Sequence, residues 1–241
     1  MCNTHLSRSL KSTKTKGITF AIPAYNAGGA ILGTVEGLLK AAIKSGICYQ
    51  IIIVNDGSTD STRQSLDKYA QEKNLTIVNL KKNQGLGNAI RIAITKARNE
   101  YLIIYPADGD IDFKYINKYL SQCAPKRILA SFFTNNQKRG LVRRCLSTLF
   151  NTIYIKTFSL PFKYINGPSF YPTKYLKQLT LKARRFSVVA EINVKLVKKG
   201  LEVKNVPMRR KTFDRGSSAL RIKNLLEVIR IFIHLVKNKY H

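Results

Sequence analysis

YLIIYPADGDID, residues Tyr101–Asp112, is the stretch from which the fold is most readily inferred. Its apolar run stops at Pro106, and three carboxylates follow, at Asp108, Asp110 and Asp112. Such clustering is unusual for a chain that holds 13 acidic and 42 basic residues. A buried strand that ends in Asp-x-Asp is one way to hold Mg²⁺ or Mn²⁺, which prefer oxygen ligands. The competing interpretation is a simple turn, because proline, aspartate and glycine are common in turns.

Composition limits the class of protein. The 241 residues are enough for one domain or two small ones, and 44% of them are hydrophobic, so a substantial core is expected. The formal net charge of +29 favours a polyanionic partner, which can be nucleic acid, an anionic membrane surface or a phosphorylated substrate. The four cysteines form no CxxC pair and the three histidines lie near the chain ends. A zinc site or a disulfide framework is therefore not expected, which fits a reducing compartment.

The two ends of the chain differ in character. Residues 1–16 are basic and polar without an apolar segment, so we expect a flexible tail rather than a secretory signal. No apolar run reaches the roughly 18 residues needed to span a bilayer. Residues 221–241 predict an amphipathic helix whose apolar positions are fringed by bases. That pattern is typical of a helix in a membrane interface, and equally of one that packs on the domain or on a partner helix.

The first part of the chain alternates between strands and helices. We predict strands at 17–22, 49–54, 75–80 and 101–105, and helices at 31–43, 61–71 and 89–98. This alternation, with nearly all-apolar strands, predicts a mostly parallel sheet flanked by helices. Ligands of such sheets bind beyond the carboxyl ends of the strands. The segments PAYN, NDGS and ADGD all follow strands, so we expect them to share one edge of the sheet.

After Asp112 the pattern changes, and we divide the expected domain into 17–112 and 113–220. The second part predicts strands at 128–133 and 201–206, an extended edge at 164–171, helices at 141–158, 188–198 and 221–237, and a basic loop at 208–218. Glu191 is the one acid of its predicted helix, and it can serve as a general base, orient a substrate hydroxyl, or form a buried ion pair. The basic loop can clamp phosphates or remain a solvated surface.

Two further motifs are ambiguous when taken alone. Asp56 follows a buried strand, where it can accept hydrogen bonds from a base or a ribose, or belong to a helix-capping turn. The segment NQGLGN, residues 83–88, can bring a helix N-terminus close to a phosphate, or it can be an ordinary helix-entry turn.

The order and spacing of these motifs identify a resemblance. With PAYN, VNDGSTDST, NQGLGNAI and PADGD, the chain is similar to family 2 glycosyltransferases of the GT-A fold, which is Rossmann-like. More narrowly, residues 17–220 resemble the dolichol-phosphate mannosyltransferase and polyprenyl-phosphate glycosyltransferase branch. The resemblance implies a metal-dependent, inverting enzyme that moves a sugar from a nucleotide-diphosphate sugar to a lipid phosphate. It further implies a peripheral, cytoplasmic location on an anionic membrane surface, where an integral membrane protein is a conceivable partner.

The resemblance also assigns roles to residues. The nucleotide-sugar side comprises Pro23, Tyr25, Asn26, Asp56, Gly57, Ser58, Gly85 and Asp108. Asp108 and Asp110 would hold Mg²⁺ or Mn²⁺ on the diphosphate. Asp110 and Glu191 would be the acidic residues with a catalytic role. The residues implied for the phosphate or the acceptor are Arg143, Arg210, Arg215 and Ser218.

Three departures from the family pattern bear on these roles. Many relatives read Asp-Ala-Asp and then Gln at the metal site. In this chain the first position of that motif is Pro106 and the last is Asp110, which leaves the ligand set open by one residue. The arginine expected three residues before the family's glycine is Phe213, so Arg210, Lys211 or Arg215 would have to supply that charge. The chain also shows no counterpart of the transmembrane helices that many relatives carry after the domain.

The alternatives concern the acceptor and the class of protein. A lipid phosphate is already anionic and needs no strong base, so Glu191 would position it; a sugar hydroxyl of a glycan would instead require Glu191 as a base. A nucleic-acid-binding protein fits the charge, but the sequence contains no recognisable binding module, and nucleic acid is not an expected partner. A catalytically inactive relative is a further alternative, because of Pro106 and Phe213.

Overall fold

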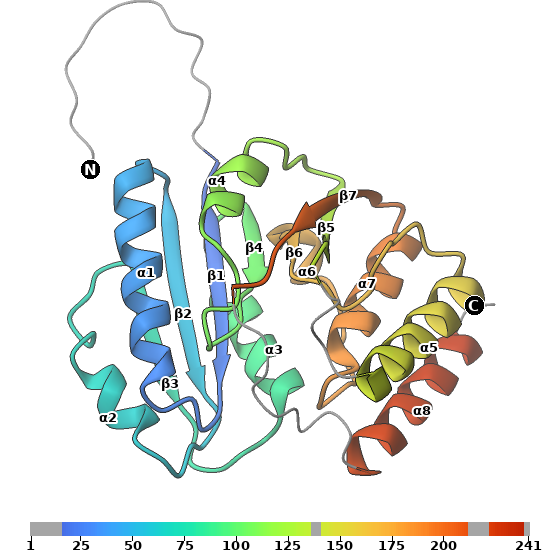
Figure 1. Ribbon diagram of the computed structural model, residues 1–241, viewed down its shortest axis with the longest axis horizontal. Coiled ribbons are helices and arrows are strands. Elements are labelled where there is room, and N and C mark those ends of the chain that lie inside the picture. Colours follow the sequence, from blue (N-terminus) through green and yellow to red (C-terminus); the bar gives the residue numbers. More distant parts are fainter. Residues whose placement is uncertain (1–15, 136–140, 212–221, 239–241) are drawn as a thin grey trace, which may run out of the picture.

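A seven-stranded sheet runs through the molecule, in the order β3-β2-β1-β4-β6-β5-β7 (Figure 1). The computed structural model describes residues 16–135, 141–211 and 222–238. The first four strands are parallel to one another, as predicted: β1 (Ile18–Ala24), β2 (Tyr49–Asn55), β3 (Leu75–Asn79) and β4 (Tyr101–Ile104).

The remaining strands extend this sheet on the β4 side. They are β5 (Arg127–Phe133), β6 (Ser169–Pro172) and β7 (Glu202–Met208). β6 is antiparallel to both β4 and β5, and β5 pairs in parallel with β7. Because β6 reverses direction between them, β5 and β7 point the same way as β1, β2 and β4. The carboxyl ends of six strands therefore lie at one edge of the sheet.

Helices cover both faces of the sheet and enclose two apolar cores. One face carries α1 (Ala30–Ser45), α2 (Thr62–Asp67) and α4 (Lys114–Leu120). The other face carries α3 (Leu86–Lys96), α5 (Leu141–Phe158), α6 (Thr173–Leu176), α7 (Val188–Lys198) and α8 (Ile222–Lys237). Side chains alternate along a strand, so Phe20 and Ile22 enter the first core while Ala21 enters the second. Burial on both faces explains why these strands are almost wholly apolar.

The structure differs from the sequence prediction in several places. The stretch 164–171 was expected at an edge, but its last part is β6, inside the sheet between β4 and β5. The helix expected from Ala89 begins earlier, at Leu86, inside the glycine motif, and α2 ends at Asp67 rather than near Gln71. The short helices α4 and α6 were not predicted at all. The expected tail lies outside the described residues up to position 15, as does the basic loop beyond Lys211.

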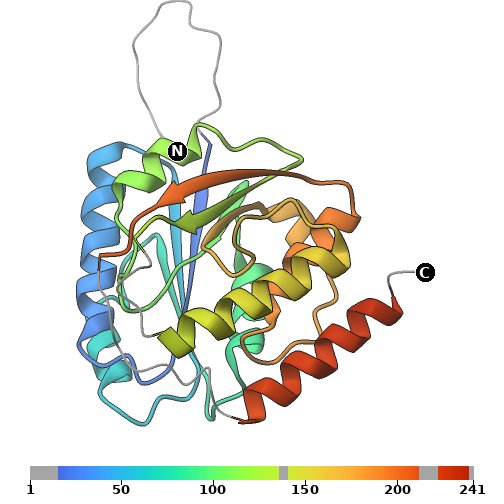
Figure 2. The ribbon, with the colours of Figure 1, turned by 45° about the vertical axis from the view of Figure 1, so that its right-hand side comes forward.

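The predicted C-terminal amphipathic helix is present as α8, and it packs beside α5. The ring of Phe232 lies 5.2 Å from that of Tyr154 and 5.7 Å from that of Phe158, between ring centres. Figures 1 and 2 show the two helices side by side on the same side of the sheet. Among the described residues, no helix combines the length and the apolar character needed to cross a membrane.

Candidate active site

The segments that follow β1, β2 and β4 meet at the carboxyl edge of the sheet. Ala24 pairs with Asn55 in the β1–β2 register, and the backbone N–H of Asp56 donates to the carbonyl of Ala24 at 2.8 Å. The N–H of Tyr105 donates to the carbonyl of Ala21, also at 2.8 Å. The expectation that PAYN, NDGS and ADGD share one edge is therefore confirmed.

Asn26 joins the first two of these segments. Its backbone N–H donates to Ser58 Oγ at 3.0 Å, and its side-chain Oδ1 accepts the N–H of Thr59 at 2.9 Å. Its backbone is left-handed, at φ 50°, a conformation that asparagine tolerates better than most residues. The neighbouring ring of Tyr25 is half exposed, and Pro23 lies within β1. The exposed ring is available to stack on a flat ligand.

Asp56 holds the glycine motif in place. The residue is buried, and its two carboxylate oxygens accept the backbone N–H groups of Gln84, at 2.7 Å, and of Gly85, at 2.8 Å. Asp56 thus has two partners within the protein, and its predicted place on the nucleotide-sugar side stays a prediction. Gly57 fits here because its φ is 66° and a Cβ there would overlap the backbone of Lys82.

The first two carboxylates of the acid cluster after β4 differ in exposure and in their contacts. Asp108 is exposed, and its Oδ1 accepts the backbone N–H of Asp110 at 3.3 Å. Asp110 is buried, and its Oδ2 accepts a hydrogen bond from the Arg210 guanidinium at 2.7 Å. The hydroxyl of Tyr105 donates to the carbonyl of Ile111 at 2.8 Å, which closes the loop onto the strand. Burial raises the pKa of this tyrosine, and the nearby aspartates raise it further.

Asp112 belongs to the same cluster but has its own cation. Its carboxylate lies 3.3 Å from the ammonium of Lys114 and accepts the backbone N–H of that residue at 3.1 Å. Burial by itself would raise the pKa of Asp112, but the two contacts with Lys114 outweigh burial and lower it below its ordinary value. Asp112 is therefore a charged, paired side chain at the start of α4.

Arg210 lies at the junction of three strand ends. Arg210 forms an isolated antiparallel β-bridge with Ile111, which follows β4. Its backbone N–H donates to the side chain of Asn135, which follows β5, at 3.0 Å. Its guanidinium carbon lies 3.8 Å from the centre of the Phe133 ring, a favourable cation–π distance. A residue of the predicted basic loop thus lies against the predicted metal site, although the sequence offered Arg210 only as one of several candidates.

The carboxylates suit one kind of metal site. Within the described ranges, no group of three or more His, Cys, Asp or Glu side chains is arranged to hold a metal ion. Mg²⁺ usually takes one or two protein carboxylates and completes its shell with water and substrate phosphates. Asp108 and Asp110 fit this arrangement, since they are adjacent oxygen donors at the edge of the sheet. They do not fit a cage built from protein ligands alone.

Glu191 is completely buried and paired within the protein. Its carboxylate accepts the backbone N–H groups of Lys182, at 3.0 Å, and of Ala183, at 2.8 Å, and it lies 2.5 Å from the ammonium of Lys195. The ion pair that the sequence analysis left open is therefore present. The catalytic role of Glu191 stays a prediction, as do the ligand contacts of the other assigned residues.

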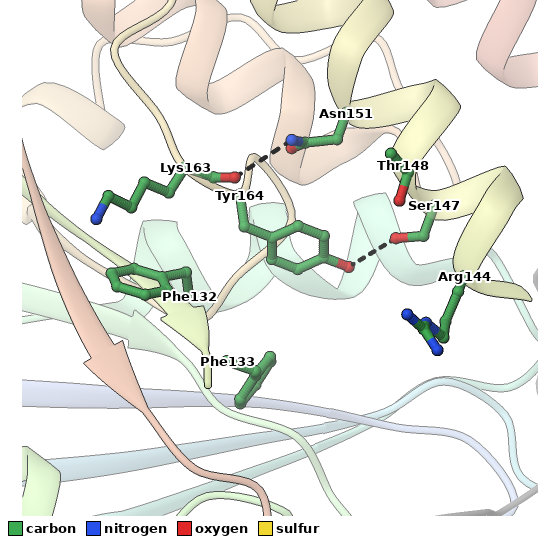
Figure 3. A pocket seen from close by; sticks show the side chains of 8 residues that line it. All are labelled: Phe132, Phe133, Arg144, Ser147, Thr148, Asn151, Lys163 and Tyr164. Atoms are coloured by element: carbon green, nitrogen blue, oxygen red, sulfur yellow. Dashed lines mark hydrogen bonds between the residues drawn. The ribbon is translucent and has the colours of Figure 1, made fainter. Parts of the chain in front are cut away.

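A cavity of about 320 Å³ opens beside Phe133 (Figure 3). The ammonium of Lys163 lies 4.7 Å from the centre of the Phe132 ring, and the Tyr164 hydroxyl is 3.4 Å from that of Ser147. The lining residues come from β5, α5 and the segment before β6: Phe132, Phe133, Arg144, Ser147, Thr148, Asn151, Lys163 and Tyr164. The sequence analysis did not predict this cavity, because three separate segments build it.

The side chains of three of the assigned acceptor residues lie outside the described set. Arg143 belongs to the first turn of α5, but its side chain is outside the described set. Arg215 and Ser218 lie outside the described residues, together with Phe213.

Comparison with known proteins identifies sequences that are similar to this chain. The family described as "Glycosyl transferase family 2" matches residues 19–192. A dolichyl-phosphate beta-glucosyltransferase of Saccharomyces cerevisiae is 25% identical over 240 residues, covering 86% of this chain and 71% of that protein. The enzyme of the same description from Dictyostelium discoideum is 29% identical over 109 residues, which are 42% of this chain. The match spans only 33% of the Dictyostelium protein's own length.

Solved structures show the same fold at low identity. Mannosyl-3-phosphoglycerate synthase from Rubrobacter xylanophilus superposes with a TM-score of 0.73 and 14% identity, over 93% of this chain and 75% of that one. Glucosyl-3-phosphoglycerate synthase from Mycobacterium tuberculosis, solved with Mn²⁺, uridine diphosphate and glucosyl-3-phosphoglycerate, has a TM-score of 0.61 and 15% identity, over 93% and 79% of the two chains. The GT-A fold expected from the sequence is confirmed.

Proposed function

Because the chain belongs to glycosyl transferase family 2, we propose that it moves a sugar from a nucleoside-diphosphate sugar to a polyprenyl or dolichyl phosphate. The observation that carries the proposal is the position of Arg210. It contacts Asp110 of the acid cluster on one side and Phe133, a wall of the cation-lined cavity, on the other. One arginine thus adjoins both a place for a diphosphate and a place for a phosphorylated acceptor.

The donor would bind along the carboxyl edge of the sheet. Tyr25 offers an exposed ring for the base, and Asp108 and Asp110 offer oxygen ligands for Mg²⁺ or Mn²⁺ on the diphosphate. A divalent cation bound there would neutralise the charge that develops on the leaving nucleoside diphosphate. Arg210 would orient Asp110 and add positive charge beside the same leaving group. The mycobacterial structure named above, which contains Mn²⁺ and uridine diphosphate, supports this use of the fold.

The acceptor phosphate would bind in the cavity beside Phe133. Arg144 and Lys163 line it with positive charge, and Ser147, Thr148 and Tyr164 add hydroxyl groups. A phosphate oxygen of the acceptor would attack the anomeric carbon from the side opposite the diphosphate. The new carbon–oxygen bond forms as the bond to the diphosphate breaks, so the configuration inverts.

This chemistry needs no strong base. The acceptor phosphate is already anionic, which agrees with the fully buried, paired carboxylate of Glu191. Transfer to a glycan hydroxyl, the alternative from the sequence analysis, would require a base with access to the acceptor. The contacts of Glu191 favour the lipid phosphate over that alternative.

The outer surfaces of α5 and α8 support a location on a membrane. Both helices expose large apolar side chains: Leu146, Leu149 and Ile153 on α5, and Leu225, Leu226, Ile229 and Ile233 on α8. Arg230 and Lys237 are exposed next to the α8 residues. Apolar side chains bordered by bases are what an anionic bilayer interface attracts. These surfaces support the proposal that the enzyme is a peripheral membrane protein, and its position on the cytoplasmic face stays the expectation from the family resemblance.

Binding and turnover together test the proposal. The full chain is titrated with a panel of nucleoside diphosphates, with and without Mn²⁺, while its thermal unfolding is followed. A ligand that binds only the folded state adds about 2.7 kcal/mol of stability at a hundredfold excess over its dissociation constant. We expect one nucleotide to raise the midpoint only with metal, and its sugar to be transferred to a short polyprenyl phosphate. The absence of a metal-dependent shift with every nucleotide would refute the proposal.

A further inference from the structure

The segment 181–187, which leads into α7, is held from one side by two glutamates. Glu191 on α7 accepts the backbone N–H groups of Lys182 and Ala183. Glu227 on α8 accepts the next two, from Arg184 at 2.6 Å and from Arg185 at 2.8 Å. Four successive backbone donors thus end on carboxylates, which form stronger hydrogen bonds than neutral acceptors do.

Glu227 makes a third contact with the same segment. Its Oε2 accepts the hydroxyl of Ser187 at 3.0 Å, and Arg185 also reaches Asn224, one turn earlier on α8, at 3.3 Å. Ser187 and Asn224 are buried. Removal of the Glu227 carboxylate would therefore leave the part-buried hydroxyl of Ser187 without its acceptor, which is costly, and would release two exposed backbone donors to water.

The other side of the segment faces the glycine motif. The carbonyl of Arg184 accepts the backbone N–H of Gly87 at 2.8 Å, and the carbonyl of Ala183 accepts the Arg91 guanidinium at 2.9 Å. A Cβ at Gly85 would overlap the carbonyl oxygen of Arg184, and one at Gly87 would overlap that of Ala183. The two backbones are therefore in direct contact, and movement of the segment must move the glycine motif.

The glycine motif in turn contacts the donor side of the sheet edge. The N–H groups of Gln84 and Gly85 donate to Asp56, whose own backbone donates to β1. A continuous series of contacts therefore leads from Glu227 on α8, through the backbone of Arg184, to Gly85 and Asp56.

We propose that Glu227 is a positioning residue for the nucleotide-sugar donor. It fixes segment 181–187, whose carbonyl groups contact the glycine motif at the start of α3. The glycine motif in turn fixes the carboxylate of Asp56, which follows β2 at the carboxyl edge of the sheet where the donor is proposed to bind. The inference rests on the proposed function. It assigns to α8 a contribution to donor binding in addition to any contact with a membrane.

Two substitutions at Glu227 test the inference. Glu227→Leu keeps the size of the side chain but removes both acceptor oxygens. Glu227→Gln keeps one oxygen for the two N–H groups, and its amide can donate to Ser187 instead. We expect the dissociation constant of the nucleoside diphosphate with Mn²⁺ to rise about tenfold in Glu227→Leu, which is the loss of roughly one charged hydrogen bond. In Glu227→Gln it should stay within about twofold of the wild-type value.

The controls separate a positioning role from a general structural one. Glu202→Gln breaks an exposed ion pair with Arg127 at the opposite edge of the sheet and should change no binding constant. The Michaelis constant of the lipid acceptor should stay unchanged in Glu227→Leu. Gly87→Ala disturbs the same contact from the loop side and should show the same selective loss of nucleotide binding, which decides the question if Glu227→Leu does not fold.

Each result has a distinct meaning. Unchanged nucleotide affinity in folded Glu227→Leu, or an equal loss of donor and acceptor affinity, would overturn the inference. A Glu227→Gln variant as weak as Glu227→Leu would overturn its hydrogen-bond basis. If the wild-type chain binds no nucleotide at all, the proposed function fails; if it binds one and both variants match it, only the role of Glu227 fails.

Discussion

The guanidinium of Arg210 lies 2.7 Å from the carboxylate of Asp110, although 100 positions separate the two residues in the sequence. The side chains are only 18% and 11% exposed, so water screens their charges weakly. Few features connect the two parts of the chain so directly. The acid follows β4, the arginine follows β7, and their contact lies where both proposed substrates would meet.

Loss of this ion pair should lower both stability and activity. Arg210→Gln removes the guanidinium that contacts the largely buried carboxylate of Asp110, and we expect a loss of about 3 kcal/mol in the free energy of unfolding. The catalytic rate should fall at least about a hundredfold, since a preorganised charge beside the leaving group is lost. Urea unfolding and steady-state kinetics measure the two effects. Lys211→Gln removes a neighbouring charge and is the matched control; an equal effect there would contradict a specific role for Arg210.

The exposed acid should matter for metal binding but not for folding. Asp108→Asn should change the free energy of unfolding by less than about 0.5 kcal/mol, because the side chain is at the surface. The same variant should need a much higher Mn²⁺ concentration for half-maximal nucleotide binding. Calorimetric titration at several Mn²⁺ concentrations measures this shift. An unchanged Mn²⁺ requirement would exclude Asp108 as a metal ligand, and chelation of the metal from the wild-type protein should abolish the nucleotide signal.

Lys163 should affect the acceptor and not the donor. Lys163→Gln removes a charge from the cavity beside Phe133, and the Michaelis constant of a short polyprenyl phosphate should rise about tenfold, as expected for one lost charged hydrogen bond. The constant for the nucleotide sugar should not change. Lys204→Gln, on the exposed side of β7, removes the same charge elsewhere and serves as control. A rise in the Michaelis constant of the nucleotide sugar alone would show that the cavity serves the donor, which contradicts its assignment to the acceptor.

Charged substitutions on α8 should weaken membrane binding. Leu226 and Ile229 are 62% and 49% exposed, and their joint replacement by glutamate should lower partitioning onto vesicles that contain anionic lipid by at least about tenfold. Sedimentation with the vesicles measures the bound fraction. Ile43→Glu introduces the same charge at an equally exposed position on α1, across the sheet, and should have little effect. Equal binding of all variants would refute a membrane contact through α8.

The cysteines should react with thiol reagents in a pattern set by burial. Burial raises the pKa of Cys123 to about 12, against a weaker opposing effect of Lys16. The thiol stays protonated below that pH, and the protonated form is not nucleophilic. At pH 8 a disulfide reagent should therefore modify exposed Cys48 and Cys145 and spare Cys123 unless the protein is unfolded. Mass spectrometry of the labelled chain identifies the sites, and rapid labelling of Cys123 in the folded protein would contradict its burial.

Local patterns were sufficient for the regular parts of the fold. The bounds of α5 and α7 match the prediction, because apolar residues recur at helical spacing along their whole length. The strands β1 to β4 were predicted to within a few residues for a similar reason, since each is a mostly apolar run. Glu191 is a related case, because its ion pair with Lys195 joins residues four apart on one helix face.

Long-range pairing could not be predicted in the same way. β6 has only four residues and follows Gly167 and Pro168, which favour an edge or a loop, yet it pairs with β4 and β5. A Cβ at Gly167 would overlap the carbonyl oxygen of Ser131, so the glycine is needed for the close approach of the backbones. The contact of Arg210 with Asp110 depends on the same assembly of strands and leaves no local signal.

The antiparallel strand β6 has a consequence for how the protein is made. During synthesis β4 is complete by residue 104, but its free side is covered only when residues 169–172 arrive. An uncovered strand edge is a template for pairing with other chains. At 5–20 residues per second, the ribosome would leave this edge exposed for several seconds. We expect nascent chains that stall before β6 to aggregate or to recruit chaperones, and those that pass it to become soluble.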